Sequence, residues 1–204
     1  QLGDVTIVND STVQPSETLI LSGTKGVTFS FLRFVRSFMP AQTTHILHLR
    51  LGAENNQVVN CAFIDQAGLI DDINRAVGMF AVHNNQLIGN TFEGFGHAIF
   101  AVGEGFDLNN QWIDNTFRHY LEDAMFVQAQ QGALIKGNRF IDFQGTGTTV
   151  AACSLRAHRN ITVEGNRVLG AIPRYAFNLF DFDNHVSGPN RIINNDVTGF
   201  TTTT

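Results

Sequence analysis

Acidic, imidazole and guanidinium groups that could act on a sugar chain gather in the middle of this sequence. His97 begins one apolar segment and Asp123 begins the next, with His119 and Glu122 just before it. Hydrolysis of a glycosidic bond needs two carboxyl groups, one of them held protonated. Elimination beside a uronate carboxylate needs a base and a cation. We therefore take Asp123 and His97 as the central catalytic candidates, with Glu122 and His119 as acid–base candidates.

Three further residues near this group would hold an acidic substrate. Arg118 precedes His119, and Arg174 and Tyr175 lie two repeats later. Guanidinium groups bind carboxylates through paired hydrogen bonds, which suits Arg118 and Arg174 to a uronate. A second interpretation is that all these residues are ordinary solvated loop charges, with Asp123 bonding a neighbouring turn.

A second polar group is predicted later in the chain. Arg156 and His158 precede Asp181 and Asp183 by 25 residues, and the two acids alternate with phenylalanine. If the phenylalanines point inward, the acids point outward, and Arg156 would pair with Asp181 and His158 with Asp183. The group is either a sugar-binding subsite or a surface ion-pair ladder worth about 0–1 kcal/mol per pair.

A repeat explains how residues so far apart would meet. Seven segments align on the pattern apolar-x-x-Asn-x-apolar, with Leu32 and Cys61 in the Asn position of the first two, and they recur every 23 to 29 residues. Such a period indicates a solenoid. Each repeat has a short apolar strand, a tight corner and another strand, which predicts one coil of a parallel β-helix. The closing apolar residues, which we call the anchors, are Phe34, Phe63, Phe92, Phe117, Phe140, Val168 and Val197.

Asparagine occupies one column of the repeat in its last five copies. A buried corner leaves backbone groups without ladder partners, and Asn offers both a donor and an acceptor. Stacked one per coil, these side chains are expected to form an internal ladder. Glycines 89, 137 and 165 precede three of them and suit a corner with positive φ. The ladder residues are Asn90, Asn115, Asn138, Asn166 and Asn195.

A column of glutamines is predicted to face outward. Gln57, Gln86 and Gln111 each lie six positions before an anchor, and asparagines flank them. These amides could bond sugar hydroxyls along a groove. A stacked amide ladder that stabilises the coils is the favoured interpretation.

The pattern resembles the pectate-lyase-like (pectin lyase) superfamily. The resemblance rests on "LIGNTF" (87–92), "WIDNTF" (112–117), "LIKGNRF" (134–140) and "ITVEGNRV" (161–168). It implies an all-β, single-stranded right-handed parallel β-helix of about seven to eight coils. The superfamily holds polysaccharide lyases, glycoside hydrolases, epimerases and phage tailspike depolymerases, so fold alone does not choose a reaction. Residues 122–128 only loosely match a strand of several such enzymes, since Leu121 stands where their His would be.

Composition excludes several other classes of protein. The 204 residues carry a formal net charge of −5 without a basic run, which argues against nucleic-acid binding. No apolar segment is long enough to span a membrane. Cys61 and Cys153 lie about three coils apart, too far for a disulfide. No cofactor is predicted; calcium stays open as an alternative, although no clear trio of acids stands out that would hold it.

The sequence therefore predicts one β-helix domain over residues 1–200, followed by a tail or linker stub at 201–204. The first functional hypothesis is a polysaccharide-active domain, a lyase or a hydrolase, acting on an acidic glycan. The alternative is a non-catalytic module, such as an adhesin or tailspike stalk or a glycan-binding domain, so whether the chain is an enzyme stays open. Open strand edges at both ends would be capped by further domains or subunits. An extracellular, cell-surface or virion-associated location is expected.

Overall fold

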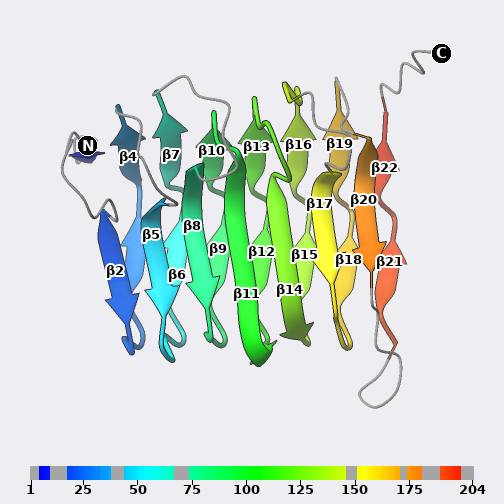
Figure 1. Ribbon diagram of the computed structural model, residues 1–204, viewed down its shortest axis with the longest axis horizontal. Coiled ribbons are helices and arrows are strands. Elements are labelled where there is room, and N and C mark those ends of the chain that lie inside the picture. Colours follow the sequence, from blue (N-terminus) through cyan, green and yellow to red (C-terminus); the bar gives the residue numbers. More distant parts are fainter. Residues whose placement is uncertain are drawn as a thin grey trace.

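The computed structural model describes residues 5–9, 18–37, 44–66, 74–145, 151–170, 174–180 and 189–198. Within these ranges the chain is all-β, with no helix, and the strands form three parallel sheets. Successive strands pass from one sheet to the next, and each strand pairs in parallel with its counterpart in the adjoining coil (Figure 1). The predicted parallel β-helix is confirmed. No helix in the described residues is long and apolar enough to cross a membrane.

Sheet 1 has eight strands and contains the anchors. In spatial order they are β1 (Val5–Asn9), β4 (Leu32–Arg36), β7 (Ala62–Asp65), β10 (Thr91–Glu93), β13 (Thr116–Arg118), β16 (Arg139–Ile141), β19 (Arg167–Leu169) and β22 (Asp196–Val197).

Sheet 2 has seven strands, longer on average, and faces the viewer in Figure 1. Its strands are β2 (Leu19–Ser22), β5 (Thr44–Arg50), β8 (Asn74–Phe80), β11 (His97–Leu108), β14 (Met125–Gln131), β17 (Ala151–Arg156) and β20 (Tyr175–Phe180).

Sheet 3 has seven short strands that meet sheet 1 at the Asn corner. They are β3 (Thr28–Ser30), β6 (Gln57–Val59), β9 (Gln86–Ile88), β12 (Gln111–Ile113), β15 (Leu134–Lys136), β18 (Thr162–Glu164) and β21 (Arg191–Ile193).

The anchors are in register along sheet 1, as the repeat predicts. The rings of Phe34, Phe63, Phe92, Phe117 and Phe140 stack in sequence with centroids 4.8–5.0 Å apart. All five are buried. One continuous apolar column therefore runs inside the helix and fixes the register of the coils that carry the polar residues.

The predicted Asn ladder is present and has one direction. The Oδ1 of Asn115 accepts hydrogen bonds from both the backbone N–H and the Nδ2 of Asn90, at 2.9 and 3.0 Å. Asn115 and Asn138 are joined in the same way, and so are Asn138 and Asn166. Each Nδ2 also donates to a backbone carbonyl of an earlier coil, such as Leu87 for Asn115. The ladder thus satisfies corner groups that the sheets leave unpaired.

The corners confirm the expected glycine conformations. Gly89, Gly137 and Gly165 have φ of 64–66°, and Asn60 and Asp114 adopt the same left-handed conformation in equivalent corners. On the outer surface of the β-helix, the Nε2 of Gln57 donates a hydrogen bond to the Oε1 of Gln86 at 3.0 Å, and the Nε2 of Gln86 donates one to the Oε1 of Gln111 at 3.3 Å. These bonds agree with a stabilising glutamine ladder. Both cysteines are free and buried, as predicted.

Candidate functional site

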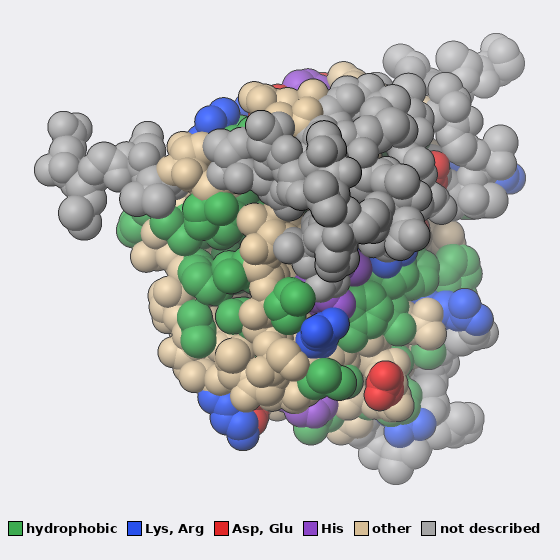
Figure 2. Space-filling view, turned by 60° about the vertical axis from the view of Figure 1, so that its left-hand side comes forward, with side chains coloured by type: hydrophobic (Ala, Val, Ile, Leu, Met, Phe, Trp, Pro, Cys, Tyr) green, Lys and Arg blue, Asp and Glu red, His purple; other side chains and the backbone are tan. Residues whose placement is uncertain are grey.

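The outer face of sheet 2 carries an aromatic strip. Phe80 of β8, Phe100 of β11 and Phe126 of β14 are half-buried, while the residues that alternate with them point into the core. The Phe100 and Phe126 rings stack with centroids 5.0 Å apart, and Phe80 lies 5.9 Å from Phe100. In the right-hand half of Figure 2, hydrophobic, histidine and arginine side chains lie next to one another. An apolar strip with basic groups beside it is suited to a ligand that has both apolar and acidic parts.

His97 lies at the start of β11, next to the strip. Its Nδ1 is 3.0 Å from the backbone carbonyl oxygen of Asp123. A carbonyl only accepts, so Nδ1 carries the proton and Nε2 keeps its lone pair. Burial lowers the pKa of His97 to about 4, opposed by the bond to Asp123 and assisted by the charge of Arg75. At neutral pH the imidazole is therefore a neutral base of fixed orientation.

Asp123 is the neighbour of His97, as the repeat predicts, but the hydrogen bond between them is made by the backbone carbonyl of Asp123 and not by its carboxylate. The carboxylate Oδ1 instead accepts the N–H of Ala151 on the following coil, at 2.6 Å. Burial raises the pKa of Asp123 to about 6, against the lowering effect of hydrogen bonds from Ser154 and Ala151. The charge of Glu122 raises the pKa further. The carboxyl group can thus exchange a proton near neutral pH.

Arg75 supplies a cation at the same place. It is in register with His97 on the neighbouring strand, and its guanidinium carbon lies 3.4 Å from the centroid of the Phe100 ring. A guanidinium over an aromatic face is held by cation–π attraction. The base and the cation therefore sit on adjacent strands beside the aromatic strip.

Two more histidines extend the group, and the repeat pattern predicted neither of them. His45 and His48 of β5 stack with ring centroids 4.6 Å apart, and both contact the edge of Phe80. Burial lowers the pKa of His45 to about 3, with smaller contributions from His48, Arg75 and Arg36. The His45 ring occupies the space above Gly78, where any Cβ would overlap it. A glycine inside an apolar strand was the available signal, since it often marks such a close approach.

Arg118 and His119 lie away from His97. Arg118 ends β13 in sheet 1 and is exposed, and the His119 Nδ1 lies 3.5 Å from a carboxylate oxygen of Glu93. In the described part of the chain no hydrogen bond or ion pair joins His119 to Asp123. Glu122 lies beside Asp123, and its backbone N–H donates to Gly96. The structure thus brings together His97, Asp123 and Glu122 of the predicted catalytic group, but not His119.

Two of the other predicted substrate-binding residues, Tyr175 and Arg156, lie on strands of sheet 2. Tyr175 is in register with Ala151. The guanidinium carbon of Arg174 lies 5.3 Å from the centroid of the Tyr175 ring, and both side chains are exposed. Arg156 is exposed, but its register partner is Phe180, one residue short of the predicted Asp181.

The predicted outward orientation of His158 is wrong. The side chain is fully buried, its Nε2 lies 3.0 Å from the carbonyl oxygen of Val127, and burial lowers its pKa to about 4. His158 follows Ala157, whose φ of 53° turns the chain and ends the simple alternation of the strand. Asp181 and Asp183 lie outside the described residues.

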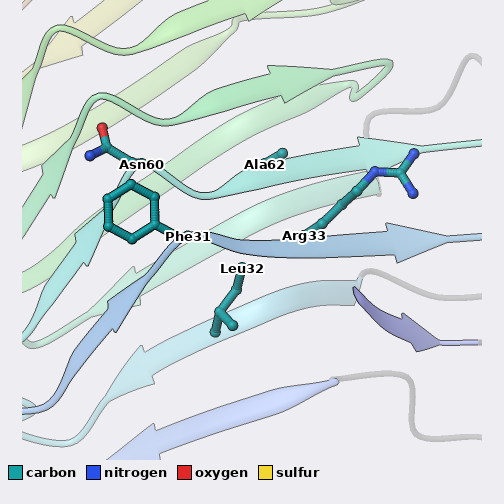
Figure 3. Close-up of a pocket in the computed structure, with 5 residues that line it drawn as sticks. All are labelled: Phe31, Leu32, Arg33, Asn60 and Ala62. Atoms are coloured by element: carbon teal, nitrogen blue, oxygen red, sulfur yellow. The ribbon is translucent and has the colours of Figure 1, made fainter. Parts of the chain in front are cut away.

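A pocket elsewhere offers little chemistry. A hollow of about 190 Å³ lies at the corner between β3 and β4 and is lined by Phe31, Leu32, Arg33, Asn60 and Ala62 (Figure 3). Asn60 lies beside the Phe31 ring, while Arg33 extends away from it. The lining has no acid and no imidazole. Among the described residues, no group of three or more His, Cys, Asp or Glu side chains could hold a metal ion.

The buried histidines predict a loss of stability in acid. An unfolded histidine binds a proton below its ordinary pKa of 6.5, whereas the pKa of folded His158 is about 4. Between these values the unfolded chain holds more protons, so stability falls as the pH falls, by at most about 1.4 kcal/mol per pH unit for this group. We expect His158→Asn to reduce the slope of unfolding free energy against pH in this window, measured by urea denaturation. An unchanged slope would contradict the assignment.

Comparison with known proteins identifies no family. No protein-family model and no curated protein matches the sequence. One solved structure with a similar fold is described as "Glycoside hydrolase", with 14% identity, a TM-score of 0.43, and 85% of this chain and 34% of that chain covered. Another is "Geobacillus virus E2 - ORF18", with 14% identity, a TM-score of 0.35, and 98% and 53% covered. This chain spans about a third of the first and about half of the second.

Proposed function

We propose that this chain is a polysaccharide-active β-helix domain that cleaves an acidic glycan by β-elimination on the outer face of sheet 2. One observation carries the proposal. His97 is a neutral base whose Nδ1 is fixed by the Asp123 carbonyl, and the guanidinium of Arg75 lies on the adjacent strand. A base beside a cation is the pair of groups that elimination from a uronate requires.

The chemistry would follow from this placement. Arg75 pairs with the uronate carboxylate and so acidifies the C–H next to it. The Nε2 of His97 removes that proton, a carbon–carbon double bond forms, and the bond to the leaving sugar oxygen breaks. Asp123 is suited to protonate that oxygen, since burial raises its carboxyl pKa to about 6. The ring edges of Phe100 and Phe126 would provide apolar contacts for the C–H groups of the sugar rings.

A non-catalytic glycan-binding module is the second candidate. The Oδ1 of Asp123 already accepts the Ala151 N–H, which is a structural role. The stacked phenylalanines and Arg75 would bind an acidic glycan without cleaving it. Either function would suit an extracellular, cell-surface or virion-associated protein.

Incubation of the purified domain with uronic-acid and neutral polysaccharides separates the candidates. We expect ultraviolet absorbance from unsaturated ends with acidic glycans and none with neutral ones. New reducing ends without that absorbance would point to hydrolysis and would reject elimination. Binding without any product, in a folded protein, would establish the binding module instead.

A further inference from the structure

The corner between Val102 of β11 and the start of β12 is longer than the corresponding corners of the neighbouring coils between sheets 2 and 3. Phe80, Val102, Gln128 and Arg156 are in register along sheet 2. Five residues separate Phe80 from β9, Gln128 from β15, and Arg156 from β18, but eight separate Val102 from β12. The pairing of β11 with β14 shifts at the same place, between Val102 and Asp107. Three residues are therefore inserted here, in the sequence Gly-Glu-Gly-Phe (103–106).

The insertion creates a hollow of about 230 Å³. Its lining comes from this corner and from the corner of the preceding coil, and consists of Ala81, His83, Glu104, Gly105, Phe106 and Asp107. Insertions on a regular scaffold commonly carry binding functions. The volume lies below the roughly 300 Å³ at which pockets for drug-sized ligands begin, so it suits one small ring.

The polar groups of the hollow have defined hydrogen-bonding roles. The Nδ1 of His83 accepts the backbone N–H of Leu108 at 3.0 Å, so the neutral ring presents Nε2–H as a donor. Glu104 is exposed and presents carboxylate acceptors. Asp107 is buried, and its carboxylate contacts the amide of Gln130, which makes it part of the frame.

An aromatic ring completes the hollow. The guanidinium carbon of Arg159 lies 4.0 Å from the centroid of the Phe106 ring. Arg159 pairs with Gln131, so it lies two coils after the corner that contains Phe106. This contact holds the inserted segment against the regular coils and fixes the orientation of the ring.

We propose that this hollow binds a single neutral sugar ring and is a second site, distinct from that on the outer face of sheet 2. Sugar hydroxyls would donate to Glu104 and accept from His83, while the C–H groups of the ring would pack on Phe106. The lining itself carries two carboxylates, Glu104 and Asp107, which would repel an acidic sugar, and the nearby guanidinium of Arg159 is engaged on the Phe106 ring. The site lies near the end of β11 opposite to His97, so it could hold a chain while the other site acts.

Deletion of residues 103–105 tests the proposal, because it restores the five-residue corner that four other coils use. Wild-type protein titrated with methyl glycosides of neutral hexoses should show saturable chemical-shift changes by NMR, and the deletion should weaken binding by at least about tenfold. Phe106→Ala and Glu104→Gln should each weaken it without removing the corner, which covers the case in which the deletion variant does not fold. His97→Gln should leave it unchanged.

Two results would overturn the second site. One is the absence of saturable binding to the wild-type protein. The other is binding of equal strength in the wild-type and Phe106→Ala proteins. Neither result bears on the acidic-glycan activity, which is assayed separately through unsaturated products and His97→Gln.

Discussion

Replacing Asn115 by alanine is expected to lower the free energy of unfolding by about 3–5 kcal/mol, a large part of the roughly 5–15 kcal/mol of a typical domain. The Asn115 Oδ1 accepts two hydrogen bonds from Asn90, and its Nδ2 donates to Asn138 and to the Leu87 carbonyl. Alanine would leave the buried Asn90 N–H and Leu87 C=O without partners. Each unsatisfied group costs about 1–3 kcal/mol. Urea denaturation measures the loss.

The outward glutamine ladder provides a matched control. Gln86 lies in the same coil as Asn90 and also bonds to amides of the coils before and after, but its side chain is part-exposed. Water can replace those bonds, so Gln86→Ala should change stability by no more than about 0.5 kcal/mol. Equal losses in Gln86→Ala and Asn115→Ala would show that burial of the ladder is not the source of its stabilising effect.

His97→Gln is expected to reduce kcat on an acidic glycan by about 10²–10⁴-fold, the usual contribution of a general base. Glutamine can still donate a hydrogen bond to the Asp123 carbonyl but has no basic nitrogen, so the fold and KM should change little. Because the pKa of His97 is about 4, the wild-type acid limb of kcat/KM should lie near that pH, below the ordinary value of 6.5. Initial rates of unsaturated-product formation across pH measure both effects.

His119→Gln is the control for this substitution. His119 is a histidine of the neighbouring corner, but it contacts Glu93 on the sheet 1 side. Its replacement should leave kcat within about twofold of wild type, since surface changes away from a site have small effects. Equal losses of kcat in the two variants would show that His97 is not the base.

The repeat made most of the fold predictable. The anchors and the Asn column carry a signal every coil, and both are in the predicted places. The prediction failed where the period changes locally: the register partner of Arg156 is Phe180, and His158 turns inward after the corner at Ala157.

The candidate site was only partly predictable, for a different reason. A shared coil length brings His97 next to Asp123, and counting residues finds that pair. His45 lies above Gly78 because its ring extends from its own coil over the backbone of the next coil. Such a contact leaves no periodic trace, because it involves one histidine and one glycine in different coils. The bond of the Asp123 carboxylate to Ala151 is likewise set by local geometry.

The one-way Asn ladder has a consequence for how this protein can change in length. Each rung donates to the next and accepts from the last in the same manner, from Asn90 to Asn195. A whole coil could therefore be duplicated or deleted during evolution without leaving an unpaired amide, since the rungs on either side would join. Removing half a coil would instead place an apolar residue of a strand at the corner where the ladder needs an Asn, so the ladder would be interrupted there. Variation among relatives of this chain should accordingly come in complete turns, with shorter insertions confined to corners such as 103–106.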